Sequence, residues 1–354
     1  MKTLNSQLKL CGYDLLGNNG EEGIRYAWKY GNKEHLLESA AFTQKTKGIE
    51  EQICGYTTSV SMGCILRSLG CSCKFCRTGK KLPFSNMLTA LDITKQNVLM
   101  VLTDMNCSDN RVIRSNKREF AYMGQGEPGY SYVQLRIAIK LTDIIMKTLN
   151  QTVHRHLIAT SGIPEMIEAY KKDISTNFFD SRVTMHFSLH ATSRRNDIMP
   201  INAIYPYTSV LSSLSDIYDL TGEKPCVGIM LLNNFSPSNS SFSYSNDAKT
   251  IQEILQELNP KLFRISLCEF NDSEDLGATN SFSEDECNEI LKIAQQKGFE
   301  AKLFSSFGKK ETAACGMLGG KEPQNKIKKK WIDLEKYADE LIEKAIKEMQ
   351  GDVK

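Results

Sequence analysis

The chain has 354 residues, of which 41% are hydrophobic and 24% are charged, and its formal net charge is +2. A chain of this length and composition can bury a large core, which excludes a disulfide-held mini-protein. No uninterrupted apolar run approaches the ~20 residues that span a bilayer, so we expect no membrane segment. The one concentrated basic run, at 326–330, can contact phosphates, although such runs are usually a solvated face.

Eleven cysteines are many for a chain of this length. The residues from Met1 to Gln7 are not followed by the long apolar core of a signal peptide, so we expect a reducing, cytoplasmic compartment. Clustered cysteines in such a compartment serve metals or catalysis more often than crosslinks. The sequence therefore indicates cysteines that act as ligands or nucleophiles.

The predicted elements begin with residues 1–50, where the alternating run 24–30 indicates a β-hairpin extension. From 51 to 320, short β-rich segments alternate with amphipathic helical ones. Strands are predicted at 57–64, 118–123, 156–159, 183–189, 226–232, 262–267 and 300–304. Helices are predicted at 133–147, 164–172, 207–221, 246–258 and 283–296. The last segment, 321–354, carries a charged amphipathic helix at 331–349.

This alternation is typical of βαβ units and of a parallel sheet or barrel. About six repeats are present, and no GxGxxG follows the first strand as a dinucleotide site requires. We therefore predict an α/β fold with a partial TIM-like (β/α)6 barrel at 51–320, a small N-terminal β-hairpin extension and a C-terminal helix.

The most informative motif is a group of cysteines directly after the first predicted strand of the barrel. Cys64 stands upstream of Cys73 and Cys76, which form a CxxC pair. Three thiolates on one loop, with a fourth metal position left open, are what a [4Fe–4S] cluster needs, and a strand-end loop delivers them to a barrel mouth. A structural zinc site would need a second CxxC pair, which the sequence lacks. Cys71 lies between and is a rival for the first ligand.

Small and polar residues follow later strands, where barrel enzymes place ligand contacts. In Gly124-Gln125-Gly126-Glu127-Pro128 the glycines permit close approach of a ligand, and the glutamate offers a carboxylate to an ammonium group. Thr160-Ser161-Gly162, Ser188-Leu189-His190-Ala191 and Glu269-Phe270-Asn271 stand at successive strand ends. A lone histidine is more often structural than catalytic, but the strand-end position of His190 favours a role in the site.

A further cysteine, Cys315, lies on a small-residue loop after the last predicted strand. Small neighbours permit close approach of a bulky substrate. Taken alone, a buried structural thiol is the more common interpretation of such a residue.

In their order along the chain, these motifs resemble those of the RlmN/Cfr family, the radical S-adenosylmethionine (SAM) methyltransferases that modify the C2 or C8 carbon of adenosine in RNA. The similarity covers roughly 25–320. The family's SxQxGC, CxFCxTG, GxGEP, SLHA, VPIN and ACGxL elements resemble 59–64, 73–79, 124–128, 188–191, 199–202 and 314–318.

The resemblance implies a radical SAM methyltransferase whose cofactors are a [4Fe–4S] cluster and SAM. A radical route suits an adenine carbon, because that carbon is electrophilic and resists polar methylation. Cys315 would become methylated, Cys54 would resolve the covalent adduct, and Glu38 would lie near the substrate base. The implied cluster ligands are Cys64, Cys73 and Cys76, and the implied SAM contacts are Gly126, Glu127, Ser188, Leu189, His190 and Asn271.

The sequence also departs from the family pattern. Eight residues separate Cys64 from Cys73, where the family has three, and the stretch between Cys54 and Cys64 is about three residues longer than the pattern. Ala159 stands where the family has a serine of the SAM pocket. The family's helical N-terminal RNA-binding domain has almost no room before the hairpin unit. RNA recognition is therefore expected to differ, or the substrate is not the usual RNA.

Three interpretations follow. The first is methylation of adenosine in rRNA or tRNA, with an electron donor such as flavodoxin or ferredoxin, by a cytoplasmic monomer. The second is the same radical chemistry on a small molecule or peptide. The third is a non-catalytic, metal-stabilised RNA-binding protein, against which the modest net charge and the lack of a basic patch with interleaved aromatics argue.

Overall fold

Eleven strands form one continuous sheet in the computed structural model, which describes residues 6–17, 23–33, 35–44, 53–106, 115–237, 241–270, 277–280, 282–304 and 318–351. Seven of these strands run parallel to one another: β4 (Ile53–Thr57), β7 (Lys117–Tyr122), β8 (Thr152–Thr160), β9 (Val183–Ser188), β10 (Cys226–Leu231), β12 (Arg264–Glu269) and β14 (Ala301–Phe304). The sheet continues beyond β4 with four antiparallel strands: β3 (Leu37–Gln44), β2 (Gly23–Tyr30), β1 (Leu8–Leu16) and β15 (Asn325–Lys326).

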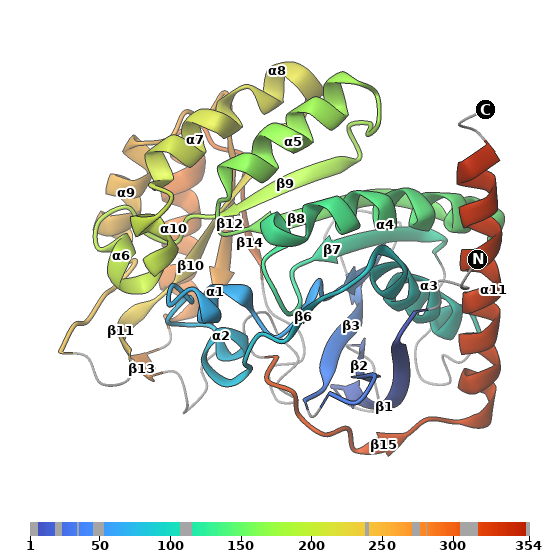
Figure 1. Ribbon diagram of the computed structural model, residues 1–354. Coiled ribbons are helices and arrows are strands. Elements are labelled where there is room, and N and C mark those ends of the chain that lie inside the picture. Colours follow the sequence, from blue (N-terminus) through green and yellow to red (C-terminus); the bar gives the residue numbers. More distant parts are fainter. Residues whose placement is uncertain are drawn as a thin grey trace.

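Helices connect the parallel strands and cover the outside of the sheet (Figure 1). The helices that follow the first six parallel strands are α3 (Ala90–Asn106), α4 (Pro128–Thr148), α5 (Pro164–Ser175), α7 (Tyr207–Ser215) with α8 (Ile217–Thr221), α9 (Ala248–Gln256) and α10 (Glu284–Gln296). Shorter helices interrupt two of the loops: α1 (Ile65–Ser68) and α2 (Arg77–Lys81) after β4, and α6 (Arg195–Ile198) after β9.

Local capping residues begin several of these helices. Ser283 and Glu286 form a capping box at α10, in which each side chain bonds the other residue's backbone N–H. Asp247 accepts from Thr250 N at 2.8 Å at the start of α9. Such caps fix where each strand-end loop turns into its helix, and thus hold the loops that surround the barrel mouth.

The C-terminal helix α11 (Lys329–Gly351) stands upright along one side of the molecule, next to α3 and α4 (Figure 1). Its Trp331 ring packs on Tyr13 and Tyr26 of the extension, with ring centroids 4.3 Å and 6.0 Å apart. We call the sheet face that carries Tyr26 the outer face and the opposite one the inner face. Because side chains alternate along a strand, Arg25, Ala27 and Lys29 of β2 belong to the inner face.

One strand prediction needs correction. The sequence pattern predicts a strand at 57–64, whereas β4 ends at Thr57 and only Ser61–Met62 are extended again, as β5 beside β6 (Asn86–Met87). The chain leaves the sheet because Val60 N and Ser61 N both donate to Gln125 O, at 2.9 Å and 3.3 Å. It therefore wraps the loop after β7 instead of pairing with a neighbouring strand.

The sequence pattern also does not indicate helix α3. Most of its residues are buried, including polar ones, so it has no apolar stripe with a polar opposite face. The polar residues bond to β4 and the segment after it: Asp104 accepts from Tyr56 OH at 2.7 Å, and Gln96 accepts from Ser59 N at 3.1 Å. The buried polar residues of α3 are thus stabilised by hydrogen bonds to other elements, and the sequence of the helix lacks an amphipathic pattern for this reason.

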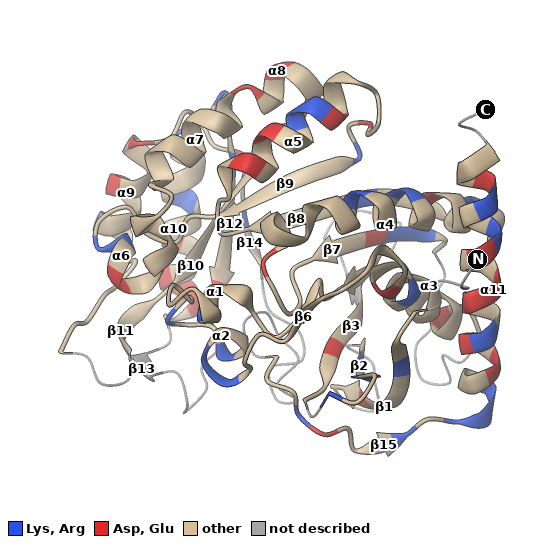
Figure 2. Ribbon diagram, viewed as in Figure 1, with Lys and Arg blue, Asp and Glu red and all other residues tan. Residues whose placement is uncertain are grey.

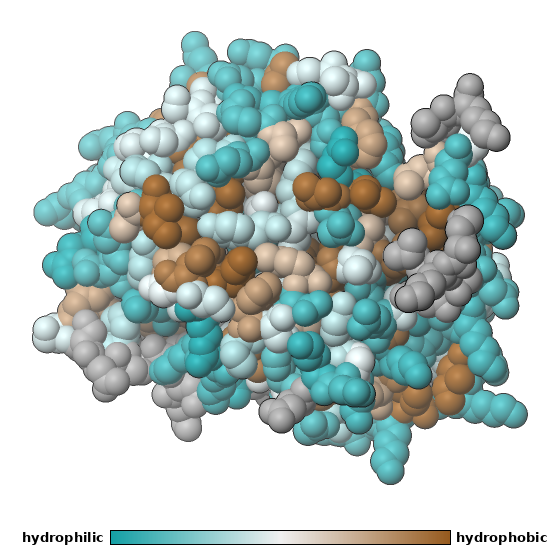
Figure 3. Space-filling model, viewed as in Figure 1, coloured by the Kyte–Doolittle hydropathy of each residue, from teal (hydrophilic) through white to brown (hydrophobic). Residues whose placement is uncertain are grey.

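The described surface is mixed in character. In Figure 3 the hydrophobic side chains on the visible face form patches that hydrophilic ones separate. Within the described residues, no helix combines the length and apolarity needed to cross a bilayer. The boundaries at residues 50 and 320 stay a prediction, although β1 to β3 share one sheet with the barrel strands.

Candidate functional site

The predicted cluster ligands lie on one loop at the mouth, by which we mean the edge of the sheet where the parallel strands end. Cys64 is the N-cap of α1, and Cys76 is the N-cap of α2. Cys76 N donates to Cys73 O at 3.2 Å in the turn that joins the pair. The bend before Cys64 requires glycine, because Gly63 has φ +70° and a Cβ there would lie 2.2 Å from a backbone oxygen.

Burial and mutual repulsion raise the pKa values of these thiols. The pKa of Cys64 is raised to about 12, first by burial and then by Cys76. The pKa of Cys73 is raised by burial, by Cys76 and by Cys64. The pKa of Cys71 is raised by burial and then by Glu127. The repulsion between these thiolates indicates that Cys64 lies near the CxxC pair, while the choice between Cys64 and Cys71 as the first ligand stays a prediction.

The chemistry of this donor set fits an iron–sulfur cluster, because a bound cation favours the thiolate form that these buried thiols otherwise resist. In the part of the chain that the structure describes, no three His, Cys, Asp or Glu side chains are already grouped as around a metal ion. The thiols therefore fit an iron–sulfur cluster because they share one loop and affect one another's ionisation. They are not already arranged around a metal position.

Glu127 is buried at the end of β7, where it is the N-cap of α4. One of its carboxylate oxygens accepts from Gly129 N at 3.0 Å and Thr160 Oγ1 at 2.5 Å. The other accepts from Ser161 N at 2.9 Å and Ser161 Oγ at 2.7 Å. The neighbouring Gly126 has φ +103°, and a Cβ there would lie 2.2 Å from a serine hydroxyl of β5. The carboxylate therefore ties the ends of β7 and β8 together.

His190 connects the cluster loop to the ends of two further strands. Its Nδ1 accepts from Met230 N at 3.0 Å, and its ring meets the Phe75 ring edge-on, with centroids 4.9 Å apart. Burial, followed by the charge of Arg195, lowers the pKa of His190 well below its usual value, so the ring is neutral. Phe75 lies between the cysteines of the CxxC pair, which places His190 beside them.

Arg195 is a buried residue of the site that the motifs do not indicate. Its guanidinium donates to Ser161 O at 3.2 Å, to Ser188 O at 3.1 Å and to Leu189 O. Among the described residues it has no carboxylate within ion-pair distance. Its charge lowers the pKa of Cys73, against the larger effect of burial. A buried cation without a carboxylate fits an anionic group bound beside it. The position of Arg195 just after the SLHA motif is the feature of the sequence that could have indicated it as a residue of the site.

Glu38 is fully buried in β3 and belongs to an ionic network. It pairs with Arg25, which also pairs with Asp14. Glu38 Oε2 accepts from Gly320 N at 2.7 Å and from Gln125 Nε2 at 3.3 Å. The network therefore joins the extension, the GxGEP loop and the chain that leads to α11. The position near the substrate base that the sequence predicts for Glu38 stays a prediction.

Three predicted residues are not placed at this site by the described structure. Cys315 and Asn271 lie outside the described residues. Cys54 is fully buried on the outer face of β4, since it alternates with Tyr56, which reaches α3. In register it pairs with Arg118, at the start of β7 and away from the mouth. Its role as the resolving thiol stays a prediction.

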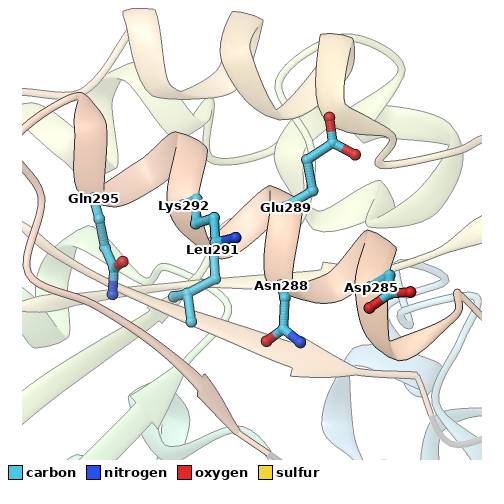
Figure 4. Close-up of a pocket in the computed structure, with 6 residues that line it drawn as sticks. All are labelled: Asp285, Asn288, Glu289, Leu291, Lys292 and Gln295. Carbon is cyan, nitrogen blue, oxygen red and sulfur yellow. The ribbon is translucent and has the colours of Figure 1, made fainter.

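A surface depression of about 490 Å³ lies elsewhere, along α10 (Figure 4). All the side chains that line it come from this one helix, and none belongs to the predicted site: Asp285, Asn288, Glu289, Leu291, Lys292 and Gln295. The cysteine loop, Glu127 and His190 offer thiols, a buried carboxylate and an imidazole that this depression does not combine, so the mouth is the candidate site. Basic residues also colour α2, beside the mouth (Figure 2).

Comparison with known proteins agrees with this geometry. No family model matches the chain. It is 28% identical over 259 residues to a probable dual-specificity RNA methyltransferase RlmN of Thermosipho melanesiensis, covering 72% of this chain and 68% of that one. It is also 28% identical over 262 residues to the ribosomal RNA large subunit methyltransferase Cfr of Clostridium botulinum, with the same coverage. The chain is therefore similar in sequence to RlmN and Cfr proteins.

The fold of this RlmN/Cfr-like protein has a solved counterpart. A radical SAM methyltransferase from Sphaerobacter thermophilus superposes with a TM-score of 0.68 at 20% identity, covering 89% of this chain and 82% of that one. The predicted resemblance and the predicted radical SAM barrel are thereby confirmed. The sequence likeness to RlmN and Cfr implies an enzyme of the radical SAM class, with SAM and a [4Fe–4S] cluster as cofactors.

Proposed function

We propose that this RlmN/Cfr-like protein is a radical SAM enzyme that methylates an sp2 carbon, C2 or C8, of adenosine in RNA. The observation that carries the proposal is the meeting of the cysteine loop with the strand-end motifs at one mouth. Lys74 N donates to Ile198 O at 2.9 Å, and Phe75 contacts His190. The relatives are named as RNA methyltransferases, which supports RNA as the substrate class.

In this proposal each residue has a distinct task. Cys64, Cys73 and Cys76 hold the [4Fe–4S] cluster, which when bound supplies the electron that generates a radical from SAM. Arg195 balances the negative charge of the thiolates, and neutral His190 leaves that balance unchanged. Cys315 carries the transferred methyl group. The SAM contacts are Gly126, Glu127, Ser188, Leu189, His190 and Asn271.

The proposal is tested by anaerobic reconstitution with iron, sulfide and SAM labelled in its methyl group. We expect label on Cys315 and production of 5′-deoxyadenosine. Cys315→Ala should remove the protein label, and Cys226→Ala, which alters a buried thiol at the start of β10, should retain it. Label that persists in Cys315→Ala, or a protein that binds zinc and no sulfide, would contradict the proposal.

The resolving role of Cys54 has weaker support, because its thiol lies on the outer face and away from the mouth. If Cys54 resolves the adduct, Cys54→Ala accumulates a protein linked covalently to RNA during turnover, and wild-type enzyme forms a disulfide between Cys54 and Cys315. Peptide mapping of the oxidised product identifies the pair. A disulfide from Cys315 to another cysteine would assign the role to that residue.

The substrate class is separated from the small-molecule alternative by offering bulk RNA and a protein-free small-molecule extract in parallel. We expect methyl label in adenosine of the RNA, and nucleoside analysis then distinguishes C2 from C8. The monomeric state, the cytoplasmic location and a flavodoxin-like or ferredoxin-like electron donor are further parts of the proposal. Label that enters only the extract would remove RNA as the substrate.

A further inference from the structure

Three lysines gather on the inner face of the extension. Lys9 of β1 lies directly opposite Lys29 of β2, and Lys326 of β15 lies opposite Gly12 of β1. Gly12 is itself opposite Ala27, which shares the inner face with Lys29. Directly opposite Cβ atoms are about 5 Å apart and diagonal ones about 7–8 Å. The ammonium groups therefore share one small area of the sheet, which we call the lysine triad.

The triad extends beyond the barrel mouth. Thr57, the last residue of β4, is in register with Ala40 of β3, which is in register with Arg25 of β2. Lys29 lies four residues further along β2, in the direction in which β4 ends. At about 3.4 Å per residue, that places the Lys9–Lys29 row about 14 Å beyond the end of β4. The extension thus forms a wall above the mouth, with lysines on its inner face.

The charge of the triad is not balanced within the described residues. All three lysines are exposed, and none has a carboxylate within 4.0 Å there. The charges of Lys29 and Glu322 both act on Cys11, so Glu322 is an acidic residue near the triad. Like charges placed directly opposite each other destabilise a sheet. Basic segments are visible on β1 and β15 in Figure 2.

Protection of a sheet edge against aggregation does not account for this arrangement. Lysines do serve that purpose on edge strands. The edge strand here is β15, however, and β2 lies two strands inside it. Lys326 can protect the edge, and so can Lys9, which lies beyond the two β1 residues that pair with β15. Lys29 lies on β2, inside β1, and is opposite Lys9, so edge protection leaves it unexplained.

We propose that Lys9, Lys29 and Lys326 bind phosphates of the RNA backbone next to the adenosine that enters the mouth. The inference rests on the proposed function, because it takes the substrate to be RNA. A row of exposed ammonium groups is suited to binding phosphate oxygens. Contacts to phosphates fix the position of a nucleic acid without reading its sequence. The triad would thus hold the RNA backbone in place while the adenosine enters the mouth.

The test compares Lys9→Gln/Lys29→Gln/Lys326→Gln with Lys261→Gln/Lys292→Gln/Lys297→Gln, three exposed lysines at the other end of the sheet. Fluorescence anisotropy measures binding of an RNA hairpin with an unpaired adenosine in its loop, at a series of salt concentrations. The triad variant should lose about tenfold or more in affinity at low salt. Its slope of log affinity against log salt should fall by about 2 to 3, because each lost phosphate contact removes about 0.7 to 0.9. The control variant should match the wild type.

Circular dichroism and melting temperature establish that both variants are folded. Equal affinity and equal slope for the triad variant and the wild type would overturn the inference. It would also be overturned if the triad variant lost binding to phosphatidylserine vesicles but not to RNA. Binding is measured without SAM, so it does not depend on turnover. A wild-type protein that fails to label Cys315 would remove the proposed function and leave the binding result interpretable by itself.

Discussion

Arg25 has no exposed surface and pairs with two buried carboxylates, Asp14 and Glu38. Removing one partner of a buried ion pair costs about 3–5 kcal/mol, because a buried charge is left unpaired. We expect Arg25→Met to lower the free energy of unfolding by about this amount. Glu38→Gln should cost less, since the guanidinium keeps Asp14. Urea unfolding monitored by circular dichroism measures both changes.

Arg194 provides the matched control for this experiment. It forms an exposed ion pair with Asp197, and such pairs contribute about 0–1 kcal/mol. Arg194→Met should therefore leave the unfolding curve nearly unchanged. If Glu38→Gln were as costly as Arg25→Met, Asp14 would not be holding the guanidinium, and the shared network would be refuted.

His186 makes the protein sensitive to acid. Its pKa is lowered to about 4, first by burial and then by Arg264 and Arg155. Between about pH 6.5 and 4 the unfolded chain binds a proton that the folded chain does not, so stability falls as the pH falls, by at most about 1.4 kcal/mol per pH unit. His186→Asn should remove this contribution. The difference in unfolding free energy between variant and wild type, measured from pH 7 to 4.5, should change with that slope; a constant difference would contradict it.

Single residues of the site differ in how far the sequence indicates them. Glu127 and His190 stand at strand ends within short motifs, so their positions follow from the order of strands. Arg25 and Arg195 carry no motif, and their partners are defined only by the fold. Glu38 and Gly320, for example, are hydrogen-bonded across 282 residues of sequence. No local pattern encodes such a contact.

At the scale of elements, the long cluster loop contains two cysteines, Cys64 and Cys71, that could each be the first cluster ligand. Cys64 and the CxxC pair act on one another's ionisation, so we propose Cys64 rather than Cys71 as the first ligand. After anaerobic reconstitution, Cys64→Ser should lose most of the iron and sulfide, while Cys71→Ser should keep them. Iron and sulfide analysis with electron paramagnetic resonance of the reduced protein gives the readout. The reverse result would make Cys71 the first ligand.

The helices differ in how visible they are from sequence. Helix α10 has a capping box and an apolar stripe of Cys287, Ile290 and Ala294, so its start and its buried face are both apparent. Helix α3 was not predicted because its buried surface includes Asp92, Gln96 and Asn97, whose partners lie on other elements. Amphipathic periodicity fails where a helix is enclosed on more than one side.

For the whole molecule, the alternation of strands and helices was sufficient to predict the barrel, because parallel strands joined by helices have few alternative arrangements. The extension was predicted only as a hairpin. Its union with the barrel sheet depends on β3 pairing with β4 and on β15 returning to β1, and both pairings are made by short segments without a distinctive pattern. Composition and periodicity do not show which distant strands pair or in which register, so these pairings could not be predicted.

The pairing of β1 with β15 also sets an order of events during synthesis. Leu10 of β1 donates to Glu335 of α11 at 3.4 Å, and these residues are 325 positions apart. A ribosome adds about 5–20 residues per second, so β1 waits roughly 15–65 s for its last partners. The cysteine loop and the two strands that flank it emerge early in that interval. The cysteine loop is therefore synthesised well before the segments that pair with β1, so this part of the barrel can form while the extension still lacks β15 and α11.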